Sequence, residues 1–498
     1  MVLPSSVLQF GSLQRSAAQQ QQQRGEQLAQ GLYEMGLREG DVVAVYLRNC
    51  PQYADVVHAC RIAGFYYCPI NWHFLAAEVQ FLLQDSGAKA LISEQSLLEK
   101  IEPQLALQVP ALVVNAANPE RDYEAWLARQ GAYQGPAATP RGHMAYTSGT
   151  TGKPKGVVRA VFPPELRAAK AQENRQLVAQ AYGLVPGTRT LLTAPIYHSA
   201  PSLYFQHALM LSELVVLEEK FDAERFLALV QEYRIETAYM VPIMYVRLLR
   251  LPEAVKARYD ISSLKFIAST GSPCAPEVKR AMIDWFGPIL NETYASSESG
   301  LVTLITAPES LQRQGSAGKP LGHAVVQIKD RAGKLLPAGE VGLIYVHQPA
   351  YADFTYRGNE AARQKMADGT LITLGDMGYL DADGYLYVCD RDSDMIISGG
   401  VNIYPAEIEH ALMHHPQVAD CAVIGIPNEE YGESLLGMVE ATAEGVTELA
   451  LQEWLKSRLA AYKVPRQFVF EKLPRDDNGK IAKRRLREKY WNQQSRKV

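Results

Sequence analysis

The sequence Thr147-Ser148-Gly149-Thr150-Thr151-Gly152-Lys153-Pro154-Lys155-Gly156 decides the interpretation of this chain. It follows a short apolar run, Met144-Ala145-Tyr146, which is typical of a strand end. Hydroxyl groups, glycines that let the main chain approach a ligand, and two lysines make a loop suited to holding a polyphosphate. It is not a Walker A loop, because Pro154 stands where Ser or Thr must follow the lysine. A plain surface loop is the alternative, and two lysines would be unusual in one.

Length and composition set the first limits. A chain of 498 residues is expected to form two or more domains. A hydrophobic content of 47% and a charged content of 21% are ordinary for a soluble enzyme, and a net charge of −4 disfavours a general nucleic-acid binder. No signal-like segment and no long apolar run is present, so we expect neither secretion nor integral membrane contact. Six cysteines without metal spacing are typical of a reduced, cytoplasmic protein.

Strand-like and helix-like segments alternate along the chain. Residues 41–47 have the character of a buried strand and residues 51–64 that of the helix packed on it. Farther on, residues 213–217, 222–233 and 237–241 predict a β-α-β unit whose helix has one apolar face. The alternation predicts an α/β fold with mostly parallel sheets flanked by helices.

Four further clusters follow the lysine-containing loop in order. They are Thr270-Gly271-Ser272-Pro273, Glu292-Thr293-Tyr294-Ala295-Ser296-Ser297-Glu298, Leu374-Gly375-Asp376, and Arg391 to Gly400. The second of them is expected to follow a strand at residues 289–290. A carboxylate such as Asp376 suits a vicinal diol, because its oxygens only accept hydrogen bonds and the diol donates two. Near the end of the chain, the turn sequence Asp476-Asp477-Asn478-Gly479 places Lys480 on a tight loop.

Together these segments resemble the motifs of the adenylate-forming superfamily, which includes acyl-CoA and aryl-CoA synthetases. The resemblance extends over nearly the whole chain, and the ordered set is far more specific than any one motif. It implies a large N-terminal adenylation domain, residues 1–392, and a small mobile α+β domain, residues 393–498, that rotates about a hinge at Ser393. The family usually has Asp or Lys at that hinge position, so the pivot is less well defined here.

The resemblance also implies a role for each matching residue. Lys480, Glu298, Thr147 and His198 would be catalytic, with Glu298 as the Mg²⁺ ligand and His198 as a positioning residue. The residues expected to bind ATP or CoA are Thr147, Ser148, Gly149, Thr150, Thr151, Gly152, Lys153, Lys155, Gly271, Ser272, Pro273, Glu292, Thr293, Tyr294, Ala295, Ser296, Ser297, Asp376, Arg391, Ser398, Gly399, Gly400, Tyr431, Lys463 and Lys480. The expected acyl pocket consists of His198, Tyr204, Phe205, Tyr239, Met240, Val241 and Ser269.

The expected activity is an AMP-forming acid-thiol ligase, an acyl-CoA synthetase that uses ATP, Mg²⁺ and coenzyme A. The apolar pocket suits an aryl, alicyclic or medium-chain carboxylic acid, and the lack of an aspartate near His198 or Tyr239 disfavours an amino acid. Transfer to a carrier protein, a luciferase-like oxygenase, and a nucleotide-binding regulator without turnover are the alternatives. Plain structural roles also stay open for individual residues: His198 at a strand end, Ser272 in an ordinary turn, Lys480 as a solvated charge. The sequence is compatible with a homodimer and does not fix the oligomeric state.

Overall fold

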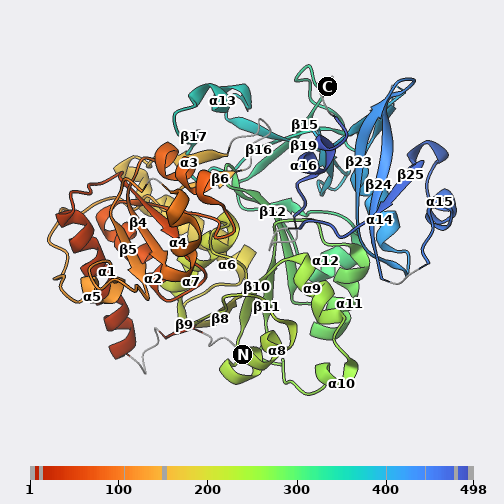
Figure 1. Cartoon of the computed structure of the whole chain (residues 1–498). Helices are drawn as coiled ribbons and strands as arrows, with labels where there is room; N and C mark the ends of the chain where they lie inside the picture. Colours follow the sequence, from red (N-terminus) through yellow and green to blue (C-terminus); the bar gives the residue numbers. More distant parts are fainter. Residues whose placement is uncertain are drawn as a thin grey trace.

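The structure is a computed structural model that describes residues 6–9, 15–105, 107–147, 154–399, 401–442, 445–475 and 480–491. Figure 1 shows a large part, which the chain builds up to β20 (Leu386–Arg391), and a smaller part, coloured blue, built by the rest. None of the described helices is long and apolar enough to cross a lipid bilayer.

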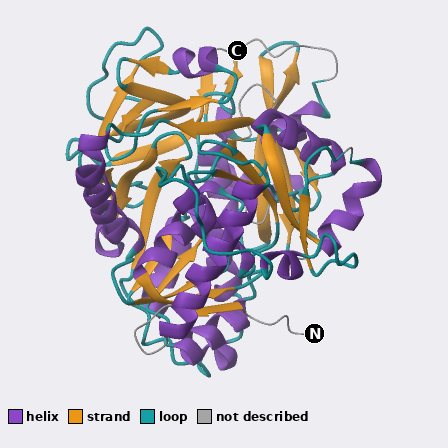
Figure 2. Cartoon of the chain, turned by 90° about the vertical axis from the view of Figure 1, so that its left-hand side faces the viewer, coloured by secondary structure: helices purple, strands orange, loops and turns teal. Residues whose placement is uncertain are grey.

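The first sheet of the large part is entirely parallel, with the strand order β3-β2-β4-β5. All five residues of β2 are buried, as expected for a strand covered on both faces. Helices lie over the strands of the large part in Figure 2. The elements of this region are α1 (Arg15–Glu34), β2 (Val42–Tyr46), α2 (Gln52–Ala63), β3 (Tyr66–Pro69), α3 (Ala76–Ser86), β4 (Ala88–Glu94), α4 (Gln95–Ile101), β5 (Ala111–Val114) and α5 (Tyr123–Leu127).

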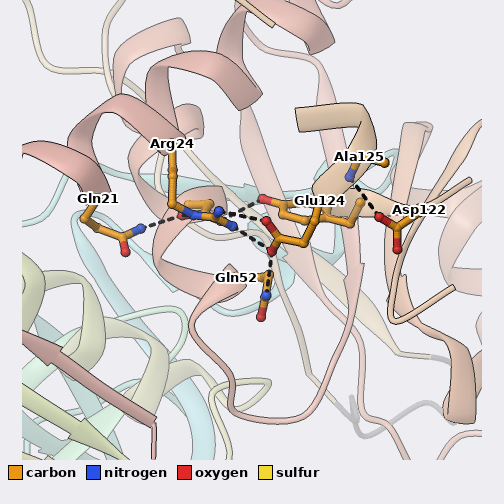
Figure 3. A network of polar contacts seen from close by, with 8 residues as sticks. Gln21, Arg24, Gln52, Asp122, Glu124 and Ala125 are labelled. Atoms are coloured by element: carbon orange, nitrogen blue, oxygen red, sulfur yellow. Dashed lines mark hydrogen bonds and ion pairs between the residues drawn. The ribbon is translucent and has the colours of Figure 1, made fainter. Parts of the chain in front are cut away.

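Helix α1 contains the five glutamines and packs along α2 through a polar network that Figure 3 shows. Arg24 connects α1 with α2 and α5, because its guanidinium lies 2.7 Å from Oδ2 of Asp55 in α2 and 2.8 Å from Oε2 of Glu124 in α5. Gln21 and Tyr123 also donate hydrogen bonds to Asp55, whose side chain is only 1% exposed. The network therefore satisfies a buried carboxylate and fixes the N-terminal helix on the first sheet.

The largest sheet has eight strands in the order β1-β9-β8-β10-β11-β12-β13-β14. The predicted β-α-β unit is confirmed, and β8 lies between its two strands and parallel to both. The elements of this region are β1 (Ser6–Gln9), α6 (Pro164–Tyr182), β8 (Thr188–Leu192), α7 (Ser199–Leu211), β9 (Ser212–Leu217), α8 (Ala223–Tyr233), β10 (Thr237–Met240), α9 (Pro242–Leu249), α10 (Glu253–Lys256), β11 (Phe266–Ser269), α11 (Pro276–Phe286), β12 (Leu290–Ser296), β13 (Gly300–Ile305), α12 (Ala307–Gln312) and β14 (Lys319–Pro320).

Two antiparallel sheets complete the large part, and the sequence pattern did not indicate them. A three-stranded sheet has the order β17-β7-β6, and a five-stranded one has β15-β16-β19-β18 with β20 paired to β19. Their elements are β6 (Ala145–Thr147), β7 (Lys155–Arg159), β15 (Val325–Lys329), β16 (Gly342–His347), β17 (Phe354–Tyr356), α13 (Glu360–Lys365), β18 (Ala367–Asp368), β19 (Leu371–Leu380) and β20.

The small part is an α+β unit with its own apolar core, built around Ile396, Ile408 and Leu412. Its sheet has the order β22-β21-β24-β23, with β25 paired to β24. The elements are β21 (Ile396–Ser398), β22 (Val401–Ile403), α14 (Pro405–Met413), β23 (Val418–Asn428), β24 (Gly432–Ala441), α15 (Glu448–Lys456), β25 (Gln467–Phe470) and α16 (Lys483–Glu488). A separate core is the physical basis for a unit that can move as one body.

Candidate active site

The two ends of the opening sequence lie on paired strands. Thr147 ends β6, Lys155 begins β7, and the two residues face each other in the antiparallel pair. Lys155 and Gly156 are thus strand residues, which corrects the interpretation of all ten residues as loop. The predicted phosphate-binding residues Ser148, Gly149, Thr150, Thr151, Gly152 and Lys153 lie outside the described residues.

Glu298 lies beside this hairpin and is buried, with 7% of its surface exposed. Its Oε1 accepts hydrogen bonds from the Thr147 hydroxyl at 3.3 Å and from the Tyr356 hydroxyl at 3.0 Å. Burial and the neighbouring carboxylate raise the pKa of Tyr356. Donors on one oxygen orient a carboxylate, and a hard oxygen ligand of this kind fits Mg²⁺.

Arg159, at the far end of β7, holds the turn that carries Glu298. Its Nη2 donates to the main-chain oxygens of Ser297 at 2.7 Å and of Glu298 at 2.9 Å. Burial lowers the pKa of this arginine, although Tyr351 and Glu298 oppose the effect. One short strand therefore connects the lysine-containing hairpin with the acidic turn.

Tyr294, Asp376 and Arg391 form a second cluster. The Tyr294 hydroxyl donates to Oδ2 of Asp376 at 2.6 Å, and Nε of Arg391 lies 3.3 Å from Oδ1. Arg391 faces Asp376 because β19 and β20 pair in that register. Residues from three motifs predicted to bind ATP or CoA are thus brought together.

The segment Glu292 to Ser296 is a strand, which corrects the prediction that it follows one. It forms most of β12, pairs with β13, and has a register shift between Tyr294 and Ala295. Thr293 is buried, and its main-chain oxygen accepts a hydrogen bond from Thr270 at 3.1 Å. This bond sets the turn of Gly271, Ser272 and Pro273 beside the strand, and Gly271 has the positive φ of +95° that favours glycine.

His198 precedes α7 and is connected electrostatically with the small domain. Burial, and then the charges of Lys480 and His73, lower the pKa of His198 to about 3. The imidazole is therefore neutral near pH 7, which supports positioning rather than proton abstraction. Lys480, itself exposed, comes from the far end of the chain, where Arg475 and Ile481 form an antiparallel bridge.

The predicted acyl-pocket residues are buried, apart from the half-buried His198, and they include three aromatic side chains. The rings of Tyr204 and Tyr239 contact each other edge to face, with their centroids 5.4 Å apart, and both rings contact that of Tyr182. The Tyr204 hydroxyl is engaged by Thr190 at 2.5 Å and also by Thr237. Residues of the set with at most 1% exposure are Tyr204, Phe205, Tyr239, Met240, Val241 and Ser269.

The predicted CoA-binding residues lie on the small domain. Gly399 donates its N–H to the main-chain oxygen of Tyr431 at 2.9 Å, and Ser398 pairs with Gly432. Lys463 is ion-paired with Glu407 at 2.6 Å, so its charge is already engaged within the domain. Gly400, predicted to bind CoA together with Gly399, lies outside the described residues.

The predicted hinge is attached to the small domain by an arginine. Nη1 of Arg487 donates to the main-chain oxygen of Ser393 at 2.9 Å, and Nη2 lies 2.9 Å from Asp394. On the other side, Arg331 of the large domain lies 2.7 Å from Asp392. Asp392, before the predicted hinge, is therefore bound to the large domain, and Asp394, after it, to the small domain.

Sequence reasoning missed four residues that support the site: Tyr356, Arg159, His73 and Lys279. Lys279 lies on α11, and its Nζ is 3.2 Å from Oε2 of Glu292 with both side chains buried. The contacts of Tyr356 and Arg159 span long stretches of chain, and Lys279 reaches Glu292 across the turn between α11 and β12, so no local spacing marks them. The only local signal was the lysine-containing sequence Thr147 to Gly156, which ends three residues before Arg159.

The fold and these clusters define a two-domain adenylate-forming enzyme. Residues 7–354 match the AMP-binding enzyme family, and residues 407–480 match the AMP-binding enzyme C-terminal domain. The chain belongs to the AMP-binding enzyme family, as the sequence motifs predicted.

Individual relatives agree with this assignment. The chain is 33% identical to a feruloyl-CoA synthase from an Amycolatopsis species, covering 94% of this chain and 92% of the relative. It is also 33% identical to a 2-succinylbenzoate–CoA ligase from Bacillus licheniformis, covering 91% of each. Among solved structures, the amide bond synthetase McbA from Marinactinospora thermotolerans superposes with a TM-score of 0.82 at 26% identity, covering 95% of this chain and 94% of the other.

Proposed function

We propose that this enzyme is an ATP-dependent acyl-CoA ligase that joins an apolar carboxylic acid to coenzyme A through an acyl-AMP. The observation that carries the proposal is the position of Lys480. This small-domain lysine lies near enough to His198 for its charge to act on the imidazole. A cation from one domain thus reaches the predicted acyl site of the other.

The first half-reaction brings two anions together. The substrate carboxylate attacks the α-phosphorus of ATP, forming acyl-AMP and releasing pyrophosphate, and charge repulsion opposes the approach. Lys480 and Lys155 supply positive potential, and Thr147 supplies a hydroxyl donor. Tyr294, Asp376 and Arg391 would hold the adenosine, with the Asp376 carboxylate accepting from the ribose hydroxyls.

Glu298 fits the Mg²⁺ that this chemistry requires. The side chain is a buried carboxylate oriented by Thr147 and Tyr356, and Arg159 fixes its main chain. Bound Mg²⁺ would neutralise charge on the phosphate oxygens. The donors around Glu298 would keep its carboxylate in place while nucleotide binds.

The acyl group would occupy the region of Tyr204 and Tyr239. The aromatic and apolar side chains there suit an aryl or arylalkyl acid, in agreement with the feruloyl and succinylbenzoate substrates named for two relatives. His198, neutral near pH 7, would orient the carboxylate without removing a proton.

The second half-reaction needs a different arrangement of the domains. We place their boundary between residues 392 and 393, because Asp392 is bound by Arg331 of the large domain and Ser393 by Arg487 of the small one. Rotation there would withdraw Lys480 and bring Gly399 toward the adenylate. The CoA thiol then attacks the acyl carbonyl, forming the thioester and releasing AMP.

The acceptor distinguishes this proposal from its alternatives. Carrier-protein ligases use a protein-bound thiol, an amide bond synthetase such as McbA forms an amide, and an oxygenase would consume O₂. We propose the free CoA thiol because both relatives described above, each 33% identical to this chain, are CoA enzymes by name. The cytoplasmic location and a homodimer stay predictions.

The test is a panel of carboxylic acids scored for AMP formation with and without CoA. We expect apolar aryl acids to give the highest rates and CoA to raise turnover, because it removes the bound adenylate. Holo-carrier protein and a simple amine are the comparison acceptors. Pyrophosphate release that CoA does not accelerate, while an amine or a carrier protein does, would contradict the proposal.

A further inference from the structure

Three side chains at the contact between the domains have the composition of a metal site. Within the described part of the chain, Glu277, His410 and His414 are a group whose ligand atoms all lie within 4.8 Å of one another. Glu277 lies in the first turn of α11 in the large domain, and the two histidines lie at the end of α14 in the small domain. All three are partly exposed, so solvent and ions reach them.

The spacing of the histidines suits a shared ligand. Residues four apart on a helix lie on the same face, and this arrangement of two histidines is used to bind zinc in helical sites. Their rings are close, with centroids 4.7 Å apart. Glu277 completes a set of two imidazoles and one carboxylate, the donor set of many zinc sites that keep a position for water.

The distances require only small side-chain movements. Nε2 of His414 lies 2.6 Å from Oε1 of Glu277, and Nε2 of His410 lies 3.6 Å from Oε2. Ligands about 2.0 Å from a tetrahedral ion are separated by roughly 3.3 Å. The carboxylate and His414 must therefore separate by less than about 1 Å, which rotation of exposed side chains allows.

A backbone contact orients one imidazole for this role. Nδ1 of His414 lies 2.7 Å from the main-chain oxygen of His410, and because a carbonyl only accepts, Nδ1 is the donor. Metal-binding histidines commonly donate their second ring nitrogen in this way, which leaves Nε2 as the ligand. The carboxyl end of α14 also favours a cation, whereas Arg458, whose charge reaches His414, opposes one.

We infer that Glu277, His410 and His414 bind a divalent transition metal ion of the zinc class, and that the bound ion holds the small domain against the large one in the arrangement of this structure. Ligands from both domains are needed, so the ion binds this arrangement more tightly than any in which α11 and α14 separate. By linkage it stabilises that arrangement. If the proposed function holds, the ion favours adenylation and slows the CoA step.

Binding is tested first, with the full chain carrying no histidine tag, in excess Mg²⁺ and without nucleotide. Co²⁺ is titrated by its visible absorption and then displaced with Zn²⁺. We expect one Co²⁺ per chain, with an affinity that falls at least about a hundredfold in the double variant His410→Ala/His414→Ala and about tenfold in Glu277→Gln. His323→Ala, which removes an exposed histidine of the large domain, is the matched control and should bind as the wild type does. Equal affinity in the wild type and the double variant would overturn the site.

The effect on the domains is tested separately from catalysis. A pair of dyes, one on each domain, reports the distribution of inter-domain distances with and without Zn²⁺. We expect Zn²⁺ to narrow the distribution in the wild type and to leave the double variant unchanged. Binding without narrowing would refute the claim that the ion holds the domains. Metal binding and the inter-domain distance need no turnover, so they test the metal site independently of the ligase assignment. Slower thioester formation relative to pyrophosphate exchange on adding Zn²⁺ would test the metal site and the proposed function together.

Discussion

The buried pair of Lys279 and Glu292 offers a quantitative test of how the site is supported. The two side chains are 6% and 9% exposed, and their charged atoms lie 3.2 Å apart. Burial raises the pKa of Glu292, and Lys279 opposes this rise. In the variant Lys279→Met the carboxylate loses its counter-charge while the helix keeps a side chain of similar length.

The expected cost follows from two estimates. Coulomb attraction at 3.2 Å with an effective dielectric constant of about 20 is roughly 5 kcal/mol, and breaking buried pairs costs about 3–5 kcal/mol. The unpaired Glu292 can also become protonated, which from its ordinary pKa of 4.5 costs about 3 kcal/mol at pH 7. We therefore expect a loss of about 3 kcal/mol at pH 7, and a smaller loss at pH 5.5, where protonation is easier.

Urea denaturation of the wild type and the variants measures this loss. Lys265→Met is the matched control, because Lys265 and Glu236 form an exposed ion pair. This variant should lose less than about 1 kcal/mol of unfolding free energy. The double variant Lys279→Met/Glu292→Gln should recover most of the stability. Equal stability of Lys279→Met and Lys265→Met, or a double variant no better than the single one, would refute the reasoning.

Three other outcomes are expected. Asp376→Asn should raise the KM for ATP at least about tenfold in pyrophosphate exchange, because a hydrogen bond to a charged group is lost; an unchanged KM would argue against the ribose contact. Gly399→Leu should impair thioester formation more than pyrophosphate exchange, because Gly399 is predicted to bind CoA. Its φ of +57° disfavours a side chain, and a Cβ there would lie 3.2 Å from Tyr431. Equal impairment of the two reactions would reject the assignment of Gly399 to the CoA site. Burial lowers the pKa values of His143 and His207 to about 4. Between pH 6.5 and pH 4 the unfolded state therefore binds more protons than the folded state, and the free energy of unfolding decreases as the pH is lowered. At pH 5 the loss is about 2 kcal/mol per histidine, and His207→Gln should reduce it in urea denaturation; a midpoint equal at pH 7 and pH 5 would contradict this.

The sequence predicted the elements whose signals are local. The apolar periodicity of α8 and the buried run of β2 both follow from side chains a few positions apart. Motif order placed Tyr294, Asp376 and Arg391 in one site, and the structure brings them into contact. Here a family pattern supplied the long-range information that a single sequence lacks.

The missed features depend on tertiary contacts. The strand β12 extends through Tyr294 because β13 pairs with it, although Asn, Glu and Ser in the segment have little strand preference. Tyr356 reaches Glu298 only because β17 pairs with β7, and nothing near Tyr356 in sequence signals that. The group of Glu277 with two histidines of α14 likewise requires the domains to meet.

The central claim is that Lys480 is carried into the large domain for adenylation and withdrawn for thioester formation. The most direct measurement compares both half-reactions in Lys480→Ala by rapid mixing, with the wild type as reference. We predict that acyl-AMP formation falls about a hundredfold or more, whereas the transfer of supplied acyl-AMP to CoA stays close to the wild-type rate. An equal loss in the two half-reactions would contradict the claim.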